Sequence, residues 1–512
     1  MRPCPSSIAV LVSTVVLAAA CNGKKEPPAA GKAADGRGTA AAGRATGGTA
    51  AAAEPPRVAP PAKPLPPLEA DPGGATGTVE WITTIGGVAG EVPRALAITA
   101  GDATVVAGDF EETASFGAAG ERTSAGKADV YVARVDAAGK VEWVTTFGGK
   151  HHDRGNELAV DAAGNILVGG LFSDTMKAGE LSATSRKEGA DDLYLAGLDP
   201  HGVVQWLWTT GGDDRDDVTA VAAFPGGGWI AAVSFAREIQ LGKTVVTSRG
   251  MFDAALVKLD AGGEVEWVTP IGGEYNDYIE HVAVDANGNI FTFGRFTRGL
   301  DLGGGLLEAI GPHDLFLARF DGAGRHVWSK SIGNAFEEVA GGLAIDQAGG
   351  LAVTGSFDKE LDFLGTKLTA VGEADAFVAR IDADGKLLWA KAVGGDREDI
   401  GQAVTVDRAG NVIAAGWFET TIDLGAGIFT SKGYRDGWVV KLSPAGAPVW
   451  SRRFGDWDHD GPTAVAVASD GSVRLAGLFR YTLDLTSPGP VAVQKQGQKF
   501  AKADAFVAKL AR

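Results

Sequence analysis

The sequence predicts an all-β protein, a seven-bladed β-propeller of four-stranded blades whose ring is closed by an N-terminal strand that completes the last blade. Three observations support this prediction: a long repeat, a β pattern inside each repeat unit, and two chain ends that complement each other. Tryptophan recurs seven times between residues 81 and 450, at spacings of 62, 63, 61, 61, 61 and 61 residues. A repeat of this length is typical of propellers, solenoids and arrays.

Phenylalanine and aspartate keep the same phase as tryptophan. The tryptophans are Trp81, Trp143, Trp206, Trp267, Trp328, Trp389 and Trp450. The phenylalanines are Phe110, Phe172, Phe235, Phe296, Phe357, Phe418 and Phe479. The aspartates are Asp129, Asp192, Asp253, Asp314, Asp375, Asp436 and Asp504. We interpret the aromatic residues as packing between blades and the aspartates as buried acceptors for backbone N–H groups.

One repeat unit, residues 157–212, shows the β pattern. Short apolar or alternating runs lie at Glu157–Asp161, Ile166–Phe172, Asp192–Leu198 and Val203–Thr210, with a looser segment around Leu181. Asp, Asn and Gly separate these runs, because they tolerate the backbone angles of tight turns. Four strands per unit are typical of a propeller blade.

The two ends of the repeat region predict a closed ring. The last unit stops at its third strand, Phe506–Leu510, and lacks a fourth. The first segment, Gly77–Gly87, has the pattern of a fourth strand with no unit before it. Pairing the two would complete the seventh blade and remove exposed sheet edges.

The residues before Gly77 predict export and anchoring. Residues 1–20 read as a signal peptide, with Arg2 before the short apolar stretch Ile8–Ala20. The run Leu17–Cys21 resembles a lipobox, which implies that Cys21 is lipidated. The alternative is an ordinary secretory signal with an incidental Cys21. Residues 21–76 then form the lipidated cysteine and an Ala/Gly/Pro-rich tether, and residues 77–512 form the propeller.

Composition narrows the function classes. Cys4 and Cys21 are the two cysteines of the chain, so residues 77–512 offer no disulfide, thiolate zinc site or cysteine nucleophile. The net charge of the whole chain is −17, and it is −20 from Gly77 on, since the preceding residues carry three net positive charges. Such a domain repels phosphate groups, which argues against nucleic acid as a partner.

Two resemblances to known families rest on these repeats. Val160–Phe172 and Asp375–Asp382 resemble the bacterial repeats of the SBBP (seven-bladed β-propeller) family. The resemblance covers about 85% of the chain and implies an exported repeat protein without implying an activity. Arg134–Gly148 is similar to the tryptophan-docking repeat of quinoprotein propellers and to the lipoprotein propeller of the outer-membrane β-barrel assembly machinery.

The loops after the recurring Gly-Gly pairs hold the candidate site. An acid lies ten residues after each tryptophan, and these loops are expected to share one face of the propeller. Asp456, Asp458 and Asp460 match the Asp-x-Asp-x-Asp-Gly start of a calcium loop, in which alternating carboxylates converge on one cation. The alternative is three solvated acids in a turn. We interpret His151 and His152, in another such loop, as solvated.

The sequence leaves two functions open. The first is a membrane-anchored, extracytoplasmic binding or scaffold module for an envelope protein or a polysaccharide, monomeric and placed at the outer membrane. The second is an enzyme with an active site at the central channel, quinoprotein-like or a lyase. The fold does not choose between them, and the sequence lacks familiar catalytic motifs. A cluster of His, Arg and Tyr at the channel mouth would favour the enzyme.

Overall fold

The computed structural model describes residues 77–187, 189–425, 427–485 and 502–512. They belong to the compact unit Glu69–Arg512, and the other unit, Met1–Leu68, lies outside the described residues. The signal peptide, the lipidated Cys21 and the tether also lie outside them and stay predictions. In the described part of the chain, no helix is long and apolar enough to cross a membrane.

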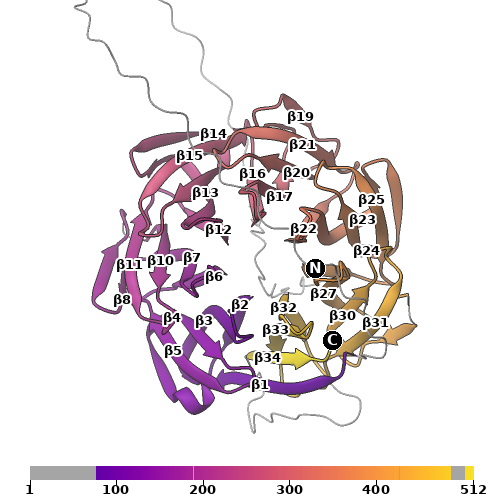
Figure 1. The fold of residues 1–512 in the computed structure, drawn as a ribbon, viewed down its shortest axis with the longest axis horizontal. Coiled ribbons are helices and arrows are strands. Elements are labelled where there is room, and N and C mark those ends of the chain that lie inside the picture. The colour runs from indigo at the N-terminus through magenta and orange to yellow at the C-terminus, as the bar shows by residue number, and fades with distance from the viewer. Residues whose placement is uncertain (1–76, 188, 426, 486–501) are drawn as a thin grey trace, which may run out of the picture. The chain divides into compact units, whose positions relative to one another are not determined.

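Unit Glu69–Arg512 is a β-propeller of antiparallel sheets set around a central axis (Figure 1). Five sheets each supply one blade of four strands paired in chain order. Their strands are β6 (Arg154–Val160), β7 (Ile166–Ser173), β10 (Asp191–Leu198) and β11 (Val204–Thr210); β12 (Asp217–Ala223), β13 (Trp229–Leu241), β14 (Thr244–Leu259) and β15 (Val265–Gly273); β16 (Asp277–Val284), β17 (Ile290–Phe296), β20 (Asp314–Phe320) and β21 (His326–Ile332); β22 (Glu338–Ile345), β23 (Leu351–Phe363), β24 (Thr366–Ile381) and β25 (Leu387–Val393); and β26 (Asp399–Val406), β27 (Val412–Phe418), β30 (Asp436–Leu442) and β31 (Pro448–Phe454).

An eight-stranded sheet contains both ends of the described chain. Its strands are β32 (Gly461–Val467), β33 (Val473–Phe479), β34 (Asp504–Leu510) and β1 (Val79–Gly87), followed by β2 (Glu91–Ile98), β3 (Thr104–Ser115), β4 (Glu121–Val135) and β5 (Val141–Phe147). The two sets of four meet where Gly86 and Gly87 of β1 pair with Ser115 and Ala114 of β3.

The pairing of β1 with β34 confirms that the N-terminal strand completes the last set of strands. The two strands are antiparallel, and their register runs from Val79 opposite Leu510 to Ile85 opposite Ala505. Just beyond the register, the Ala511 N–H donates to the Thr78 carbonyl at 2.7 Å. The ring is therefore closed by strands from the two ends of the described chain, as Figure 1 shows.

Short extra elements decorate the blades. They are the hairpins β8 (Thr175–Ala178) with β9 (Leu181–Thr184), β18 (Gly299–Asp301) with β19 (Leu306–Glu308), and β28 (Thr421–Asp423) with β29 (Ile428–Thr430), and one 3-10 turn, η1 (Gly117–Ala119). The looser segment predicted around Leu181 is the first of these hairpins. The four strands predicted for that repeat unit are confirmed, with boundaries that differ by up to three residues.

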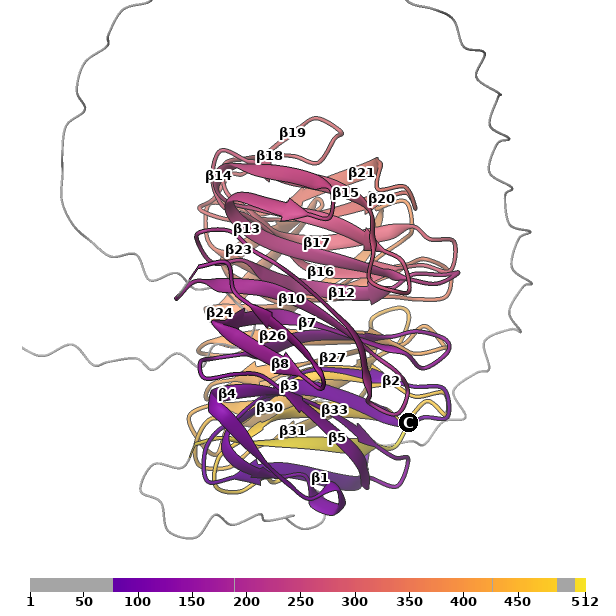
Figure 2. The same ribbon diagram turned by 90° about the vertical axis from the view of Figure 1, so that its left-hand side faces the viewer.

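The strands run roughly along the ring axis (Figure 2). The first strand of each set, such as β6 or β12, lies innermost in Figure 1. Because each set is antiparallel, the connection from an outer strand to the next inner strand emerges at the same end as the connection between the second and third strands. We call this end of the propeller the loop face.

Each phased phenylalanine lies opposite the phased aspartate of its own repeat. Phe172 pairs with Asp192, and Phe357 with Asp375, across the second and third strands. All seven aspartates are buried. The carboxylate of Asp129 accepts the Ala125 N–H at 2.9 Å, and that of Asp314 accepts the Ile310 N–H at 3.0 Å. Bonds of the same kind confirm the interpretation as buried backbone acceptors for Asp192, Asp253, Asp375 and Asp436.

The phased tryptophans pack between blades. Trp206 of β11 donates its ring N–H to the Ala261 carbonyl of the next blade at 3.2 Å. Beside that carbonyl, a Cβ built on Gly263 would lie 2.7 Å from the Trp206 ring, so the turn approaches the ring at a distance that glycine permits. The last tryptophan, Trp450, meets Gly77 in the same way at 2.8 Å. Gly77 therefore takes the place of the turn glycine at the closing blade.

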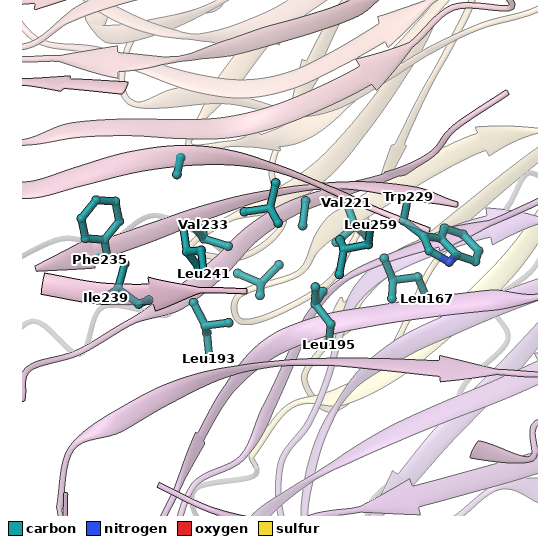
Figure 3. Close-up of a cluster of buried hydrophobic side chains, with 14 of the residues drawn as sticks. Leu167, Leu193, Leu195, Val221, Trp229, Val233, Phe235, Ile239, Leu241 and Leu259 are labelled. Carbon is teal, nitrogen blue, oxygen red and sulfur yellow. The ribbon is translucent and has the colours of Figure 1, made fainter. Parts of the chain in front are cut away.

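The hydrophobic core lies between neighbouring blades. Figure 3 shows one cluster in which Leu167, Leu193 and Leu195 of one blade contact Trp229, Val233 and Leu259 of the next. Each blade is apolar on both faces, because both faces are covered. This explains why the second and third strands read as nearly continuous apolar runs rather than alternating ones.

Candidate functional site

The loop face brings two sets of loops together. Isolated parallel bridges join a third strand, or the residue just before it, to the loop that leaves the same blade: Ala128 with His152, His313 with Glu337, Ala374 with Glu398, and Arg435 with His459. This recurring contact holds the ends of both loops in one place in each blade where it occurs. The side chains between these fixed points are free to differ from blade to blade.

The acid that recurs ten residues after each tryptophan is part of the scaffold. All seven of these acids are buried. Asp153, for example, accepts the Gly149 N–H at 2.6 Å, and Asp277 accepts the Gly273 N–H at the same distance. Burial raises the pKa of Asp153 and of Asp277 to about 7, although these bonds act in the opposite direction. The acids therefore close the turn, and their burial leaves little access for a ligand.

The three predicted calcium ligands have different surroundings. Asp460 is 2% exposed and accepts the N–H groups of Asp456 at 2.8 Å and Arg480 at 2.9 Å, as its counterparts do in other blades. The Asp458 carboxylate lies 2.5 Å from the His459 ring and 3.4 Å from the Arg480 guanidinium. No group of three or more His, Cys, Asp or Glu side chains in the described part of the chain is arranged to hold a metal ion. Calcium binding stays a prediction and requires these side chains to rearrange.

A cavity of about 400 Å³ opens on the loop face where β4, β6, β10 and the β11–β12 loop meet. Its basic lining residues are Lys127, His151, His152, Arg154 and Arg215. Ser173, Asp174 and Asp191 also line it, and Leu171 adds apolar surface. A cavity of this size suits a small organic ligand. His151 and His152, for which the sequence predicts solvated side chains, are exposed residues that line this cavity.

Arg154 is the most unusual group in the cavity. It is half-buried at the start of β6, and its guanidinium makes no hydrogen bond or ion pair with another described residue. The Arg154 carbonyl accepts a hydrogen bond from the Tyr194 hydroxyl at 2.9 Å, which holds the backbone of Arg154 in place. Desolvation and the nearby Arg94 guanidinium lower the pKa of Arg154, whereas the carboxylates of Asp109 and Asp217 act in the opposite direction. Arg154 is therefore attracted by two acids without forming an ion pair with either.

Arg94 and Arg215, the two arginines near Arg154, are already paired. Arg94 forms an ion pair with Asp109 of the same blade. Arg215 lies 3.3 Å from Asp217, and the Asn156 side chain donates to Asp217 at 2.7 Å. Two ion pairs therefore flank one unpaired guanidinium. Partial desolvation lowers the pKa of His152, and Lys127 and Arg154 lower it further, although Glu111 and Asp109 act in the opposite direction.

The sequence contains a signal for this cavity that the repeat pattern alone does not reveal. The residues that follow the seven recurring acids are Val92, Arg154, Asp217, Tyr278, Val339, Ile400 and Gly461. Arginine occurs once in this series, beside His151 and His152, and the position of His152 holds a histidine in one other repeat, at His459. Such a break in a repeat marks a position that the scaffold does not determine. The sequence alone does not show that Lys127, Arg154 and Arg215 from three repeats meet in one cavity.

Apolar and aromatic side chains are exposed elsewhere on the same face. Tyr434 is 72% exposed and stacks on His459, with ring centroids 5.6 Å apart. Trp457 is 76% exposed in the adjoining loop. Met251 of β14, Val371 of β24 and Ile310 are also exposed at the corresponding ends of other blades. The opposite end of the propeller also exposes apolar side chains, among them Val203, Val327 and Leu388, so this exposure does not single out the loop face.

Comparison with known proteins assigns neither a family nor a function to the chain. No family model matches the sequence. The chain is 26% identical to the "Regulatory protein FlaEY" of Caulobacter vibrioides over 400 residues, which cover 70% of this chain. It is 27% identical to the "Uncharacterized WD repeat-containing protein L264" of Acanthamoeba polyphaga mimivirus over 201 residues, which cover 32% of this chain. The aligned parts span 40% and 14% of the lengths of these relatives.

Solved structures give similarities of the same kind. A protein of unknown function from Bacteroides caccae aligns with a TM-score of 0.36 and 12% identity, covering 63% of this chain and 89% of that chain. The Pan2 WD40 domain of Neurospora crassa aligns with a TM-score of 0.39 and 10% identity, covering 82% and 89%. No function follows from similarities at this level. By its own strand pairing, the described chain is a β-propeller protein.

Proposed function

We propose that this protein is an extracytoplasmic binding module that presents its loop face to a protein or polysaccharide of the cell envelope. One observation supports this most strongly: the phenylalanines and acids that recur in every repeat are buried, whereas the loop face holds non-repeated groups, including a guanidinium in a cavity that makes no ion pair with a described residue. Propellers commonly serve as binding scaffolds, and binding residues are concentrated on loops that a rigid scaffold positions.

The proposal includes a ring of seven blades, in which the eight-stranded sheet counts as two. The support is the pairing within that sheet. Phe479 of β33 pairs with Asp504 of β34, and Phe110 of β3 pairs with Asp129 of β4. Each half of the sheet therefore holds the same buried pair as the separate blades. The count also agrees with the resemblance of the repeats to the SBBP family.

The proposal also includes a lipid anchor at Cys21 and a position at the outer membrane. The support is the sequence before Gly77, where the lipobox-like run precedes a tether of low hydrophobicity. A flexible coil of that length has a typical reach of about 40 Å. The Cys21→Ser variant is expected to lose the lipid and to move from the membrane to the soluble fraction. Membrane fractionation of the variant beside the wild type tests this, and a variant that stays with membranes contradicts it.

Site-specific photo-crosslinking in cells tests the binding face. A photoreactive amino acid at Tyr434, on the loop face, is expected to capture a defined envelope component. The matched control places the same amino acid at Asp384, whose side chain is 91% exposed in the turn between β24 and β25 at the opposite end of the blade. Equal capture from both positions, or capture from Asp384 alone, contradicts the assignment of the loop face.

The enzyme with an active site at the central channel stays a second candidate. The loop-face cavity is a different location for such a site, since histidines and arginines gather there. The hydroxyl in the described lining, that of Ser173, contacts Asp191 and not a histidine, so the cavity does not form a nucleophile–base pair of the usual kind. An enzyme working here would require His152 as a base. Loss of a measurable turnover of an envelope polysaccharide in His152→Gln, with binding retained, would favour this candidate over a binding module.

A further inference from the structure

We propose that the cavity around Arg154 binds a singly charged carboxylate that carries hydroxyl groups, such as a uronic acid unit of an acidic polysaccharide. This inference rests on the proposed function, since it names the ligand class of the same face. It joins three observations: an unpaired cation, a cavity of limited volume, and acids placed beside the cations.

The unpaired cation requires an anion. A half-buried guanidinium has lost part of its hydration, and an oxyanion can replace it with charge-assisted hydrogen bonds. The planar guanidinium fork matches the two oxygens of a carboxylate. Lys127, which is exposed at the cavity rim and has no ion-pair partner among the described residues, supplies a second positive charge. The ion pair Arg94–Asp109 leaves Arg154 available because Asp109 already has its counter-ion.

The acids of the cavity select the kind of anion. Asp174 lies 3.4 Å from the His151 ring, and Asp191 accepts a bond from the Ser173 hydroxyl. Both acids would repel the extra charge of a phosphate group more than the single charge of a carboxylate. Both can also accept hydrogen bonds from hydroxyl groups of the ligand. A carboxylate on one side and hydroxyls on the other are the features of a sugar acid.

The size of the cavity sets the size of the ligand group. About 400 Å³ lies near the lower end of the range for small-molecule sites, so one sugar ring fits better than several. The opening on the loop face lets a longer chain continue beyond that ring. The charge of the propeller region favours this local recognition, because residues 77–512 carry a net charge of −20 and repel polyanions except near such a cationic patch.

Calorimetry on the full chain tests the inference with D-glucuronate as the probe and D-glucose as its uncharged counterpart. We expect glucuronate to bind with one site per chain and glucose to give no heat. Arg154→Gln is expected to weaken glucuronate binding at least tenfold, and Lys127→Gln several-fold. Arg325→Gln is the matched control, since this arginine is exposed and paired with Asp321 away from the cavity. It is expected to bind as the wild type does.

The remaining outcomes are also decisive. Melting curves show whether Arg154→Gln folds. If it does not, Lys127→Gln still tests the inference, because Lys127 is exposed and its replacement should not disturb folding. Unchanged binding in both variants overturns the inference, as does equal binding of glucose. Tighter binding of phosphate than of glucuronate also overturns the inference. So does tighter binding of a tetraglutamate peptide than of a uronate tetrasaccharide. If glucuronate does not bind but Tyr434 still captures a partner, the inference fails and the proposed function stands.

Discussion

At the scale of single residues, the chain keeps its recurring acids for the scaffold. Asp314 is fully buried and accepts the N–H groups of Ile310 at 3.0 Å and Gly311 at 2.9 Å. Asp314→Ala would leave both donors unpaired, and we expect it to destabilise the fold by about 2–4 kcal/mol. Denaturant unfolding measures the change. Asp384→Ala, at an exposed turn, is the control and is expected to change stability by less than about 0.5 kcal/mol.

A second prediction at this scale concerns the pH dependence of stability. Desolvation raises the pKa of the buried Glu338 from 4.5 to about 9. Since the folded-state pKa is the higher one, the stabilisation is complete below about pH 4.5 and is lost as the pH rises toward 9. The melting temperature should therefore fall over this range. Glu338→Gln cannot ionise and should fall less steeply, and parallel curves for variant and wild type would contradict the assignment.

Calcium binding is the third prediction at this scale. If Asp456, Asp458 and Asp460 bind Ca²⁺, the ion stabilises the folded state by mass action and raises the melting temperature. Calorimetry should then show heat for the wild type and none for Asp458→Ala. Calcium binding would require the Asp460 carboxylate to reorient, because it already accepts hydrogen bonds from two backbone N–H groups. No heat in the wild type, or equal heat in both proteins, would contradict it.

At the scale of elements, the turn glycines limit how closely one blade can approach the next. Gly202 has a φ of +83°, and a Cβ there would lie 2.7 Å from the Trp143 ring. Gly202→Ala should therefore suffer both backbone strain and a clash, for a loss of about 2–4 kcal/mol. Gly179→Ala separates the two effects, since Gly179 has a φ of +62° with nothing within 4 Å. It is expected to lose about 1 kcal/mol, and equal losses would exclude the contact with Trp143.

Elements differ in how far the sequence predicts them. Tryptophan, phenylalanine and aspartate recur because each blade solves the same packing problem, so their roles follow from the repeat. The hairpins β8–β9 and β18–β19 are short and vary between blades, so the repeat does not predict their strands, although a glycine recurs at their turns, as at Gly179 and Gly303. Arg154 stands out as a break in the repeat, but its unpaired state depends on Arg215 and Arg94 being paired elsewhere. Such pairing depends on three blades at once, which a linear pattern does not show.

At the scale of the whole molecule, the ring depends on a pairing between residues more than 400 positions apart. Val79 lies opposite Leu510, and the strands that precede β1 in the sheet come from the other end of the chain. Each other blade is made of consecutive strands, so its loops close over short distances. The closing blade forms only when both ends of the propeller meet, and closing so long a loop costs more chain entropy. The stability of the ring therefore depends on the pairing of β1 with β34.

Removal of the closing strand tests this dependence. Without residues 77–87, β34 would lose its partner and expose an unpaired edge, and Trp450 would lose the turn glycine against which it packs. An exposed edge pairs readily with other chains, so we expect a much lower melting temperature and aggregation in light scattering. The control is a deletion of the same length within the tether, residues 60–70, which shortens the chain equally and keeps β1. If the variant without 77–87 melts and scatters as this control does, β1 does not close the ring in solution.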